Sequence, residues 1–273
     1  MGNQKSKNRS FGKIEPVGIF ETIKVTADGI VVPGLHWERM SKGGKLLGIT
    51  IPAYDEWLNK IETYLRETKI EQRPFALRAE IRKDPSLISD QSQNHNHNNQ
   101  WLFSTRAVSY TREQYEEGVR ILFMPERRVD PISLNYIKSA DFLDTAAALR
   151  AVQGSGAFEG IWLNSRGQIM EGTRSNVFFV KRGHLYTPSL ESGCLAGIRR
   201  RSVIEKALEL TIPFSEGVYY PEDLLNADEV FLTNSLMEVM PVSKMEGKIF
   251  QLDGTLGRRL LLAIHGIAAL DHP

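Results

Sequence analysis

The chain has 273 residues, of which 41% are hydrophobic, so it can form one large or two ordinary domains around a buried core. Its 34 Lys and Arg residues nearly balance its 33 Asp and Glu residues, which gives no overall field that would favour nucleic acid or an acidic membrane surface. The single cysteine, Cys194, excludes an intramolecular disulfide, and no apolar run approaches the roughly 20 residues that span a bilayer. The composition therefore predicts a cytoplasmic protein without a nucleic-acid or membrane partner.

Residues 1–112 predict a small α/β domain that follows a polar leader at residues 1–12. A strand that alternates from Gly18 turns at Ala27-Asp28-Gly29 into a second strand, which is the pattern of a β-hairpin. The stretch at 54–67 carries its apolar and aromatic residues at helical spacing. The predicted strands are 18–25, 30–32, 75–82 and 101–103, and the predicted helices are 36–47, which Gly48 ends, and 54–67.

The segment Asp90–Gln100 consists of Asn, His, Gln, Ser and Asp, which cannot bury apolar area, so it predicts a mobile loop. Two histidines within it, His95 and His97, have no third ligand at the spacing of a zinc site, so no metal site is predicted. The polar residues at 110–118 predict an unstructured connection, with the linker at 113–118. Residues 119–273 would then form a second, larger domain.

The second domain is expected to begin with a strand at 117–123. Further strands are predicted at 160–164, 168–172, 177–180, 229–233 and 240–242, the last of which is expected to close the sheet. Helices are predicted after Lys138 as far as Gly154-Ser155-Gly156, from the loop at 193–200 onward, and at 256–270. The buried stripe of the middle helix would be Val203, Ile204, Ala207, Leu208 and Leu210.

Lys138 and Glu171 are the first two candidate site residues. Lys138 opens an alanine-rich helical run, and Glu171 lies in the second strand of the predicted hairpin that follows. On residue type alone, a lysine at the start of a helix is most often solvated surface. The two residues nevertheless lie on neighbouring rigid elements, where an amine and a carboxylate can be brought together.

A phosphate site is predicted where the loop at 193–197 passes into a helix. Backbone N–H groups at a helix start, together with the helix dipole, bind phosphate without any particular side chain. Gly197, Ile198 and Arg199 form this start, and the polar pair Asn234 and Ser235 ends a predicted strand and can add donors.

Four segments of the sequence resemble the motifs of a known family. GAFEGIWLN, EGTRSNVFFV, LYTPSLESGCLAGIRR and ADEVFLTNSLMEVMPV resemble the successive motifs of the fold-type IV pyridoxal phosphate enzymes, and GIFETIKV and LHWERM resemble two earlier ones. The resemblance implies an α/β fold with a small N-terminal and a larger C-terminal domain, the cofactor pyridoxal 5′-phosphate between them, a homodimer, and a small amino-acid-like substrate.

The resemblance also implies roles for the candidate residues. Lys138 would hold the cofactor aldehyde covalently and then act as the catalytic base, and Glu171 would keep the cofactor ring nitrogen protonated. The cofactor phosphate would be bound by the remaining site residues, which are Arg39, Gly197, Ile198, Arg199, Asn234 and Ser235.

The chain departs from the family pattern at three places. Leu195-Ala196-Gly197-Ile198-Arg199-Arg200 has an arginine where many members have threonine, Glu15-Pro16-Val17-Gly18 replaces an aromatic-Gly-Asp-Gly word, and the Asn/His segment replaces an arginine-rich loop. The last two changes count against a branched-chain transaminase, and TNSLMEVMPV resembles the lyase branch of the family, so the resemblance favours a 4-amino-4-deoxychorismate lyase, which gives 4-aminobenzoate and pyruvate in folate biosynthesis. The alternatives are a D-amino-acid or branched-chain-amino-acid transaminase and a non-catalytic homologue that keeps the scaffold.

Overall fold

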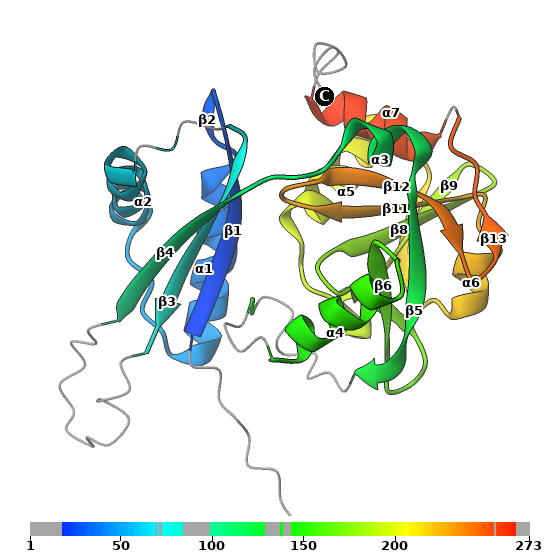
Figure 1. Cartoon of the computed structure of the whole chain (residues 1–273), viewed down its shortest axis with the longest axis horizontal. Helices are drawn as coiled ribbons and strands as arrows, with labels where there is room; N and C mark the ends of the chain where they lie inside the picture. The colour runs from blue at the N-terminus through cyan, green and yellow to red at the C-terminus, as the bar shows by residue number, and fades with distance from the viewer. Residues whose placement is uncertain are drawn as a thin grey trace, which may run out of the picture.

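The computed structural model describes residues 18–68, 70, 73–83, 99–128, 137–138, 143–253 and 255–265, with no side-chain description at 143–146 and 265. Within these residues the strands form two sheets, which lie side by side in Figure 1 with the pocket described below between them. No helix of the described part is long and apolar enough to cross a membrane. The predicted leader and most of the Asn/His segment lie outside the described residues.

The first sheet has the order β2-β1-β3-β4, and all its pairs are antiparallel. Helices α1 and α2 cover one face, against which Ile23, Leu77 and Ile81 are fully buried together with Trp57 and Ile61 of α2. The elements are β1 (Gly18–Thr26), β2 (Gly29–Ile30), α1 (Pro33–Leu47), α2 (Tyr54–Thr68), β3 (Phe75–Arg82) and β4 (Gln100–Ala107). The predicted hairpin and both helices are confirmed, and Gly48 ends α1 in the left-handed conformation that glycine adopts without strain.

The second sheet has nine strands in the described chain, with the path β10-β9-β8-β11-β12-β5-β6-β7 and β13 paired to β12. Its strands are β5 (Val119–Arg128), β6 (Glu159–Asn164), β7 (Ile169–Gly172), β8 (Asn176–Lys181), β9 (His184–Pro188), β10 (Phe214–Gly217), β11 (Glu229–Asn234), β12 (Glu238–Met245) and β13 (Lys248–Ile249). Its helices are α3 (Arg112–Glu117), α4 (Leu143–Gly154), α5 (Ile198–Glu209), α6 (Pro221–Leu225) and α7 (Leu256–His265), with a 3-10 turn at Leu190–Ser192.

Alternation along the central strands produces two cores. On one face of the sheet, Phe178 and Phe231 stack with ring centroids 5.2 Å apart and pack with Val203 and Ala207 of α5. On the other face, Val177, Phe179 and Leu232 belong to a separate buried cluster. Both faces of β8 and β11 are therefore buried, which explains their continuous apolar runs.

Three predictions for this part of the chain are wrong in detail. Residues 112–117 form α3 instead of a linker, because Thr111 and Gln114 make a reciprocal capping box. The segment 240–242 does not close the sheet, because β12 is buried and pairs with both β11 and β5. Leu208 and Leu210 are exposed, so the buried stripe of α5 is shorter than predicted. The proposed domain division at 113–118 stays a prediction.

The helix that precedes the glycines is confirmed from Leu143, and its predicted start at 139–142 lies outside the described residues. Gly156 has φ +71° directly after the end of this helix, as a glycine stop requires. The last helix is confirmed to His265, and the rest of its predicted range lies outside the description.

Candidate active site

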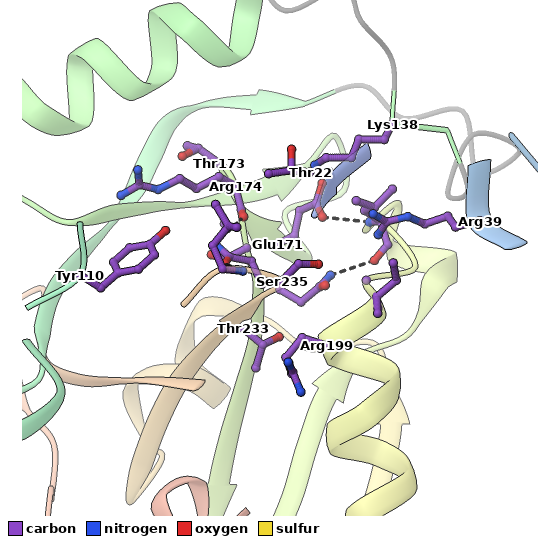
Figure 2. A pocket seen from close by; sticks show the side chains of 18 of the residues that line it. Thr22, Arg39, Tyr110, Lys138, Glu171, Thr173, Arg174, Arg199, Thr233 and Ser235 are labelled. Carbon is purple, nitrogen blue, oxygen red and sulfur yellow. Dashed lines mark hydrogen bonds between the residues drawn. The ribbon is translucent and has the colours of Figure 1, made fainter. Parts of the chain in front are cut away.

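One pocket brings together every residue that the sequence analysis singled out for a site. Its walls come from β1, α1 and β4 of the first sheet and from strand ends and loops of the second. In Figure 2, Lys138 and Thr22 lie on one side, Arg39 on another, and Thr233 and Arg199 below Ser235. The predicted residues that line it are Arg39, Lys138, Glu171, Gly197, Ile198, Arg199, Asn234 and Ser235.

Arg39 is held in place by a buried carboxylate. Glu21 of β1 accepts hydrogen bonds from Arg39 Nε at 2.8 Å and Nη2 at 2.5 Å, and its side chain is fully buried. The third guanidinium nitrogen, Nη1, donates to the carbonyl of Ala196 at 3.3 Å, directly before α5. A bidentate pair of this kind fixes the guanidinium plane, so one face of Arg39 is committed to Glu21 while its other end reaches the start of α5.

His36 completes this buried cluster. Its Nδ1 lies 2.7 Å from Glu21 Oε2 and donates to it, because an ionised carboxylate only accepts. Burial alone would raise the pKa of Glu21, but the charge of Arg39 and the hydrogen bond from His36 outweigh it and hold this pKa at about 2. Burial lowers the pKa of His36, although the hydrogen bond to Glu21 opposes this. The cluster thus contains an ionised carboxylate, a guanidinium and a neutral imidazole at neutral pH.

Lys138 is attached to the first sheet although it precedes a helix of the second. Its carbonyl accepts a hydrogen bond from Phe20 N–H at 3.0 Å, and its Nζ lies 4.9 Å from the centre of the Phe20 ring. Burial lowers the pKa of Lys138 to about 8, and the charge of Arg39 acts in the same direction. With this pKa, roughly one molecule in ten would carry the neutral, nucleophilic amine at pH 7. An ordinary lysine, whose pKa is near 10.4, would be almost fully protonated at that pH.

Glu171 lies at the end of β7 and is tied to the loop before α5. Its Oε2 accepts from Leu195 N–H at 2.9 Å, and its Oε1 lies 3.7 Å from Arg128 Nη1. Asn176 at the start of β8 donates from Nδ2 to the carbonyl of the same Leu195 at 2.8 Å. Both backbone polar groups of Leu195 are therefore held by strand residues, which fixes the path of the loop into Gly197.

Gly197 caps the N-terminus of α5 in an extended conformation. A Cβ at this position would lie 1.9 Å from Asn176 Oδ1, so only glycine fits beside that side chain. Among the described residues that line the pocket, two buried side-chain polar atoms near this helix start have no hydrogen-bond partner, Arg199 Nε and Thr233 Oγ1. Unpaired buried polar groups are costly, and here they lie at the start of a helix, where backbone N–H groups and the helix dipole favour an anion.

The guanidinium of Arg199 is directed to Glu238, with Nη2 3.5 Å from Oε1. Lys24 Nζ of β1 lies 2.9 Å from the same carboxylate oxygen. Glu238 therefore connects α5 with the first sheet. Arg199 lines the pocket, but Glu238 neutralises part of its charge.

Asn234 shapes the turn that presents Ser235. Its Oδ1 accepts from the N–H groups of Leu236 and Met237, both at 2.9 Å, and its Nδ2 donates to the carbonyl of Arg174 at 3.2 Å. The side chain of Asn234 is thus used within the turn, which differs from the expectation that it adds a donor to the phosphate. Ser235 lies in the pocket.

A second buried carboxylate, Glu159, organises the loop that follows β7. It accepts from the N–H groups of Thr173 at 3.0 Å and Arg174 at 3.3 Å and from Ser175 Oγ at 2.9 Å. All three loop residues line the pocket. Glu159 is therefore a positioning residue for this wall.

Sequence reasoning missed several of these residues. Glu21 lies in the motif GIFETIKV, and Thr22 follows it. The signal that marks a buried carboxylate is an acidic residue in a strand whose other residues are mostly apolar. The other missed residues are Arg106, Tyr110, Glu159, Thr173, Arg174, Thr233 and Glu238. No cluster of three or more His, Cys, Asp or Glu suited to a metal occurs in the described part, and His95 and His97 lie outside it.

Comparisons with known proteins point to one family. The model of the family described as amino-transferase class IV matches residues 18–245. The aminodeoxychorismate lyase of Bacillus subtilis (strain 168) is 30% identical over 237 residues, 86% of this chain and 80% of that protein. The branched-chain aminotransferase of Thermoproteus uzoniensis, solved with norvaline, is 27% identical with a TM-score of 0.77 over 91% of this chain and 84% of that chain.

A 4-amino-4-deoxychorismate lyase structure from Pseudomonas aeruginosa has a TM-score of 0.80 and covers 95% of this chain and 94% of that chain. At 23% identity, this likeness shows the fold alone. Lyases and transaminases thus both occur among the relatives of this chain.

Replacing Glu21 by Gln is expected to destabilise the protein by about 3 kcal/mol, because Arg39 would remain buried without its charge partner. The pKa of Glu21 is depressed, so its contribution to stability is full above pH 4.5 and is lost as the pH falls through about 2. Urea unfolding between pH 7 and about pH 2 measures both effects. Glu38→Gln, which removes the exposed ion pairs of Glu38 with Lys42 and with Arg201, is the control and should cost less than about 1 kcal/mol. Equal losses in the two variants would contradict the role of Glu21.

Replacing Gly197 by Ala is expected to displace Asn176 and with it the loop at Leu195. Overpacking of this kind costs about 1–3 kcal/mol, and affinity for a phosphate-bearing ligand should fall with it. Gly34→Ala is the control, since a Cβ there has open space. If the contact with Asn176 is the cause, Asn176→Ala should reduce the cost of Gly197→Ala in the double variant; strictly additive losses would show that another contact is responsible.

Proposed function

The chain belongs to the class IV aminotransferases, a family of pyridoxal phosphate enzymes, and we propose that within this family it is a 4-amino-4-deoxychorismate lyase. The mixed α/β fold is the fold-type IV architecture that the motifs predict. The proposed reaction converts aminodeoxychorismate to 4-aminobenzoate and pyruvate, a step that supplies folate biosynthesis. A homodimer in the cytoplasm is part of the same proposal.

The residues of the pocket fit pyridoxal 5′-phosphate, the cofactor of the family. The start of α5, with the unpartnered Thr233 Oγ1 and Ser235 beside it, suits the phosphate, and Arg39 supplies the positive charge. Glu171 is the acid for the ring nitrogen, and Lys138 is the amine for the aldehyde. When bound, the cofactor would supply an electron-accepting ring to the carbon that carries the substrate amine.

Lys138 is the residue that we propose moves the proton. Its pKa of about 8 lies close enough to neutral pH for the amine to take a proton from carbon and return it later. Thr22 lies on the same side of the pocket. In the proposed reaction, loss of the C–H proton is followed by cleavage of the bond to the enolpyruvyl oxygen, and the released enolpyruvate takes up a proton to become pyruvate.

The observation that favours the lyase is the charge of the pocket. Among the described residues that line it, the charged side chains are Arg39, Arg106, Lys138, Arg174, Arg199 and the single carboxylate Glu171. The cofactor phosphate would neutralise only part of this excess. Aminodeoxychorismate carries two carboxylates, whereas a branched-chain amino acid carries one carboxylate and an aliphatic group that needs an apolar wall. Arg106, Arg174 and Thr173 add polar groups beside the aliphatic lining residues Leu195, Ile198 and Leu236, which suits a second carboxylate.

The second candidate is a D-amino-acid or branched-chain-amino-acid transaminase, which the likeness to the Thermoproteus uzoniensis enzyme favours. Both reactions begin with proton loss to the same lysine, so Lys138 and Glu171 support either one. A non-catalytic scaffold is the third alternative, and the juxtaposition of Lys138, Glu171 and Arg39 in one pocket argues against it.

Lys138→Ala is expected to leave the protein folded but to abolish the visible absorbance of covalently bound cofactor and to reduce turnover at least about 10³-fold. In the wild-type apoprotein, covalent attachment should accelerate as the pH rises through about 8, because the amine loses its proton there. Lys45→Ala, an exposed position on α1, is the control. A coloured and active Lys138→Ala protein would falsify the assignment.

Lyase and transaminase are separated by the fate of the cofactor. We expect the holoenzyme to form 4-aminobenzoate and pyruvate in equal amounts from aminodeoxychorismate without a keto-acid acceptor. D-Alanine, L-leucine and L-glutamate should convert the cofactor to its pyridoxamine form slowly or not at all, as followed by absorbance. Rapid conversion with any of these amino acids, together with no 4-aminobenzoate, would favour the transaminase instead.

A further inference from the structure

The first sheet turns a cationic face toward the second sheet. Residues of β1, β3 and β4 alternate between the core under α1 and α2 and the opposite face. The register places Lys24, Ala76 and Arg106 in one cross-strand row and Thr22, Arg78 and Ser104 in the next. Lys24 of this face reaches Glu238 of β12, and Thr22 and Arg106 line the pocket. The face is therefore one wall of the active site.

Most cations of this wall have an acid beside them. Lys24 pairs with Glu238, and Arg78 lies 2.6 Å from Glu80. Arg106 differs, because its cross-strand neighbour is Ala76 and the nearest charged residues on its face are Arg78 and Lys24. It makes no hydrogen bond or ion pair to the described part of the chain, and its side chain is exposed in the pocket. A cation among like charges is stabilised when an anion joins it.

The other arginines that line the pocket are already engaged. Arg39 is held by Glu21, and Arg199 faces Glu238. Arg174 donates to the carbonyl of Phe158 at 3.2 Å and lies 3.8 Å from Glu159. Among the described lining residues, Arg106 is thus the arginine that remains for a ligand.

We propose that Arg106 binds the carboxylate of the substrate that lies farthest from the reacting amine. This inference rests on the proposed function, in which the amine must lie at Lys138 and the ring carboxylate opposite it must lie elsewhere in the pocket. A guanidinium recognises a carboxylate with two parallel hydrogen bonds. An aliphatic side chain offers no acceptor and would leave the charge unpaired. Arg106 is therefore a specificity residue for anionic substrates.

The product 4-aminobenzoate retains this carboxylate and serves as the probe, with neutral 4-aminobenzamide as its partner. Titration of the holoenzyme should show that the wild type and the control Arg66→Gln, an exposed arginine on α2, bind the benzoate at least about tenfold more tightly than the amide. Arg106→Gln should lose this preference by weakening only the benzoate, and Arg106→Lys should restore part of it. Equal weakening of both probes, or of neither, overturns the proposal.

Turnover distinguishes the two proposals. If the holoenzyme is a lyase, Arg106→Gln should raise KM for aminodeoxychorismate about tenfold or more with kcat changed less than threefold. Lyase turnover with an unchanged KM would refute the role of Arg106 and leave the proposed function intact. Absence of lyase turnover in the wild type, with the benzoate preference present and lost in Arg106→Gln, would refute the proposed function and retain an anion site at Arg106.

Discussion

The buried carboxylate of Glu21 is the constraint on which the site depends. An ionised acid in a fully buried position requires a compensating charge and hydrogen bonds; Arg39 of α1 supplies the charge, and His36 of the same helix supplies a further hydrogen bond. Once Glu21 fixes two of the guanidinium nitrogens, the third is left for the carbonyl of Ala196, at the start of α5. A polar cluster beside the first sheet thus sets where its arginine meets the start of α5 on the second sheet. The free-energy cost of burying this charge is offset by the ion pair with Arg39 and the hydrogen bond from His36.

The same arrangement recurs on the other side of the pocket. Glu171 and Asn176 hold the backbone N–H and C=O groups of Leu195, and Glu159 holds the loop at Thr173 and Arg174. In each case a side chain on a strand determines the path of a loop that lines the site. Rigid strands therefore position the loops, and the loops present the backbone donors. This explains why Gly197 tolerates no side chain, since the peptide path leaves no space beside Asn176.

Local signals in the sequence predicted the elements well and the contacts between them poorly. The hairpin at Ala27-Asp28-Gly29, the start of α5 after Gly197 and the end of α1 at Gly48 follow from turn and cap chemistry, which acts over a few residues. Thr111 and Gln114 also have the spacing of a capping box, which predicts the start of α3, but the polar composition of this stretch indicated a linker instead. The family motifs predicted eight candidate site residues, and all eight line one pocket. By contrast, the partners of Glu238 are set by register and sheet order, since Lys24 lies 214 positions away, and no local pattern contains that information.

Glu238 also explains how the chain accommodates an arginine where many relatives have threonine. A hydroxyl at position 199 would add a neutral donor, whereas a guanidinium adds a full charge at a buried position. Glu238 lies 3.5 Å from that guanidinium and 2.9 Å from Lys24, so one carboxylate partly neutralises two cations, one from α5 and one from β1 of the first sheet. The positive field at the helix start is then set mainly by the backbone N–H groups and by Arg39. Arginine at position 199 therefore affects the contact between α5 and the first sheet more than the binding of a phosphate. The charge of Arg106 remains to act on the substrate.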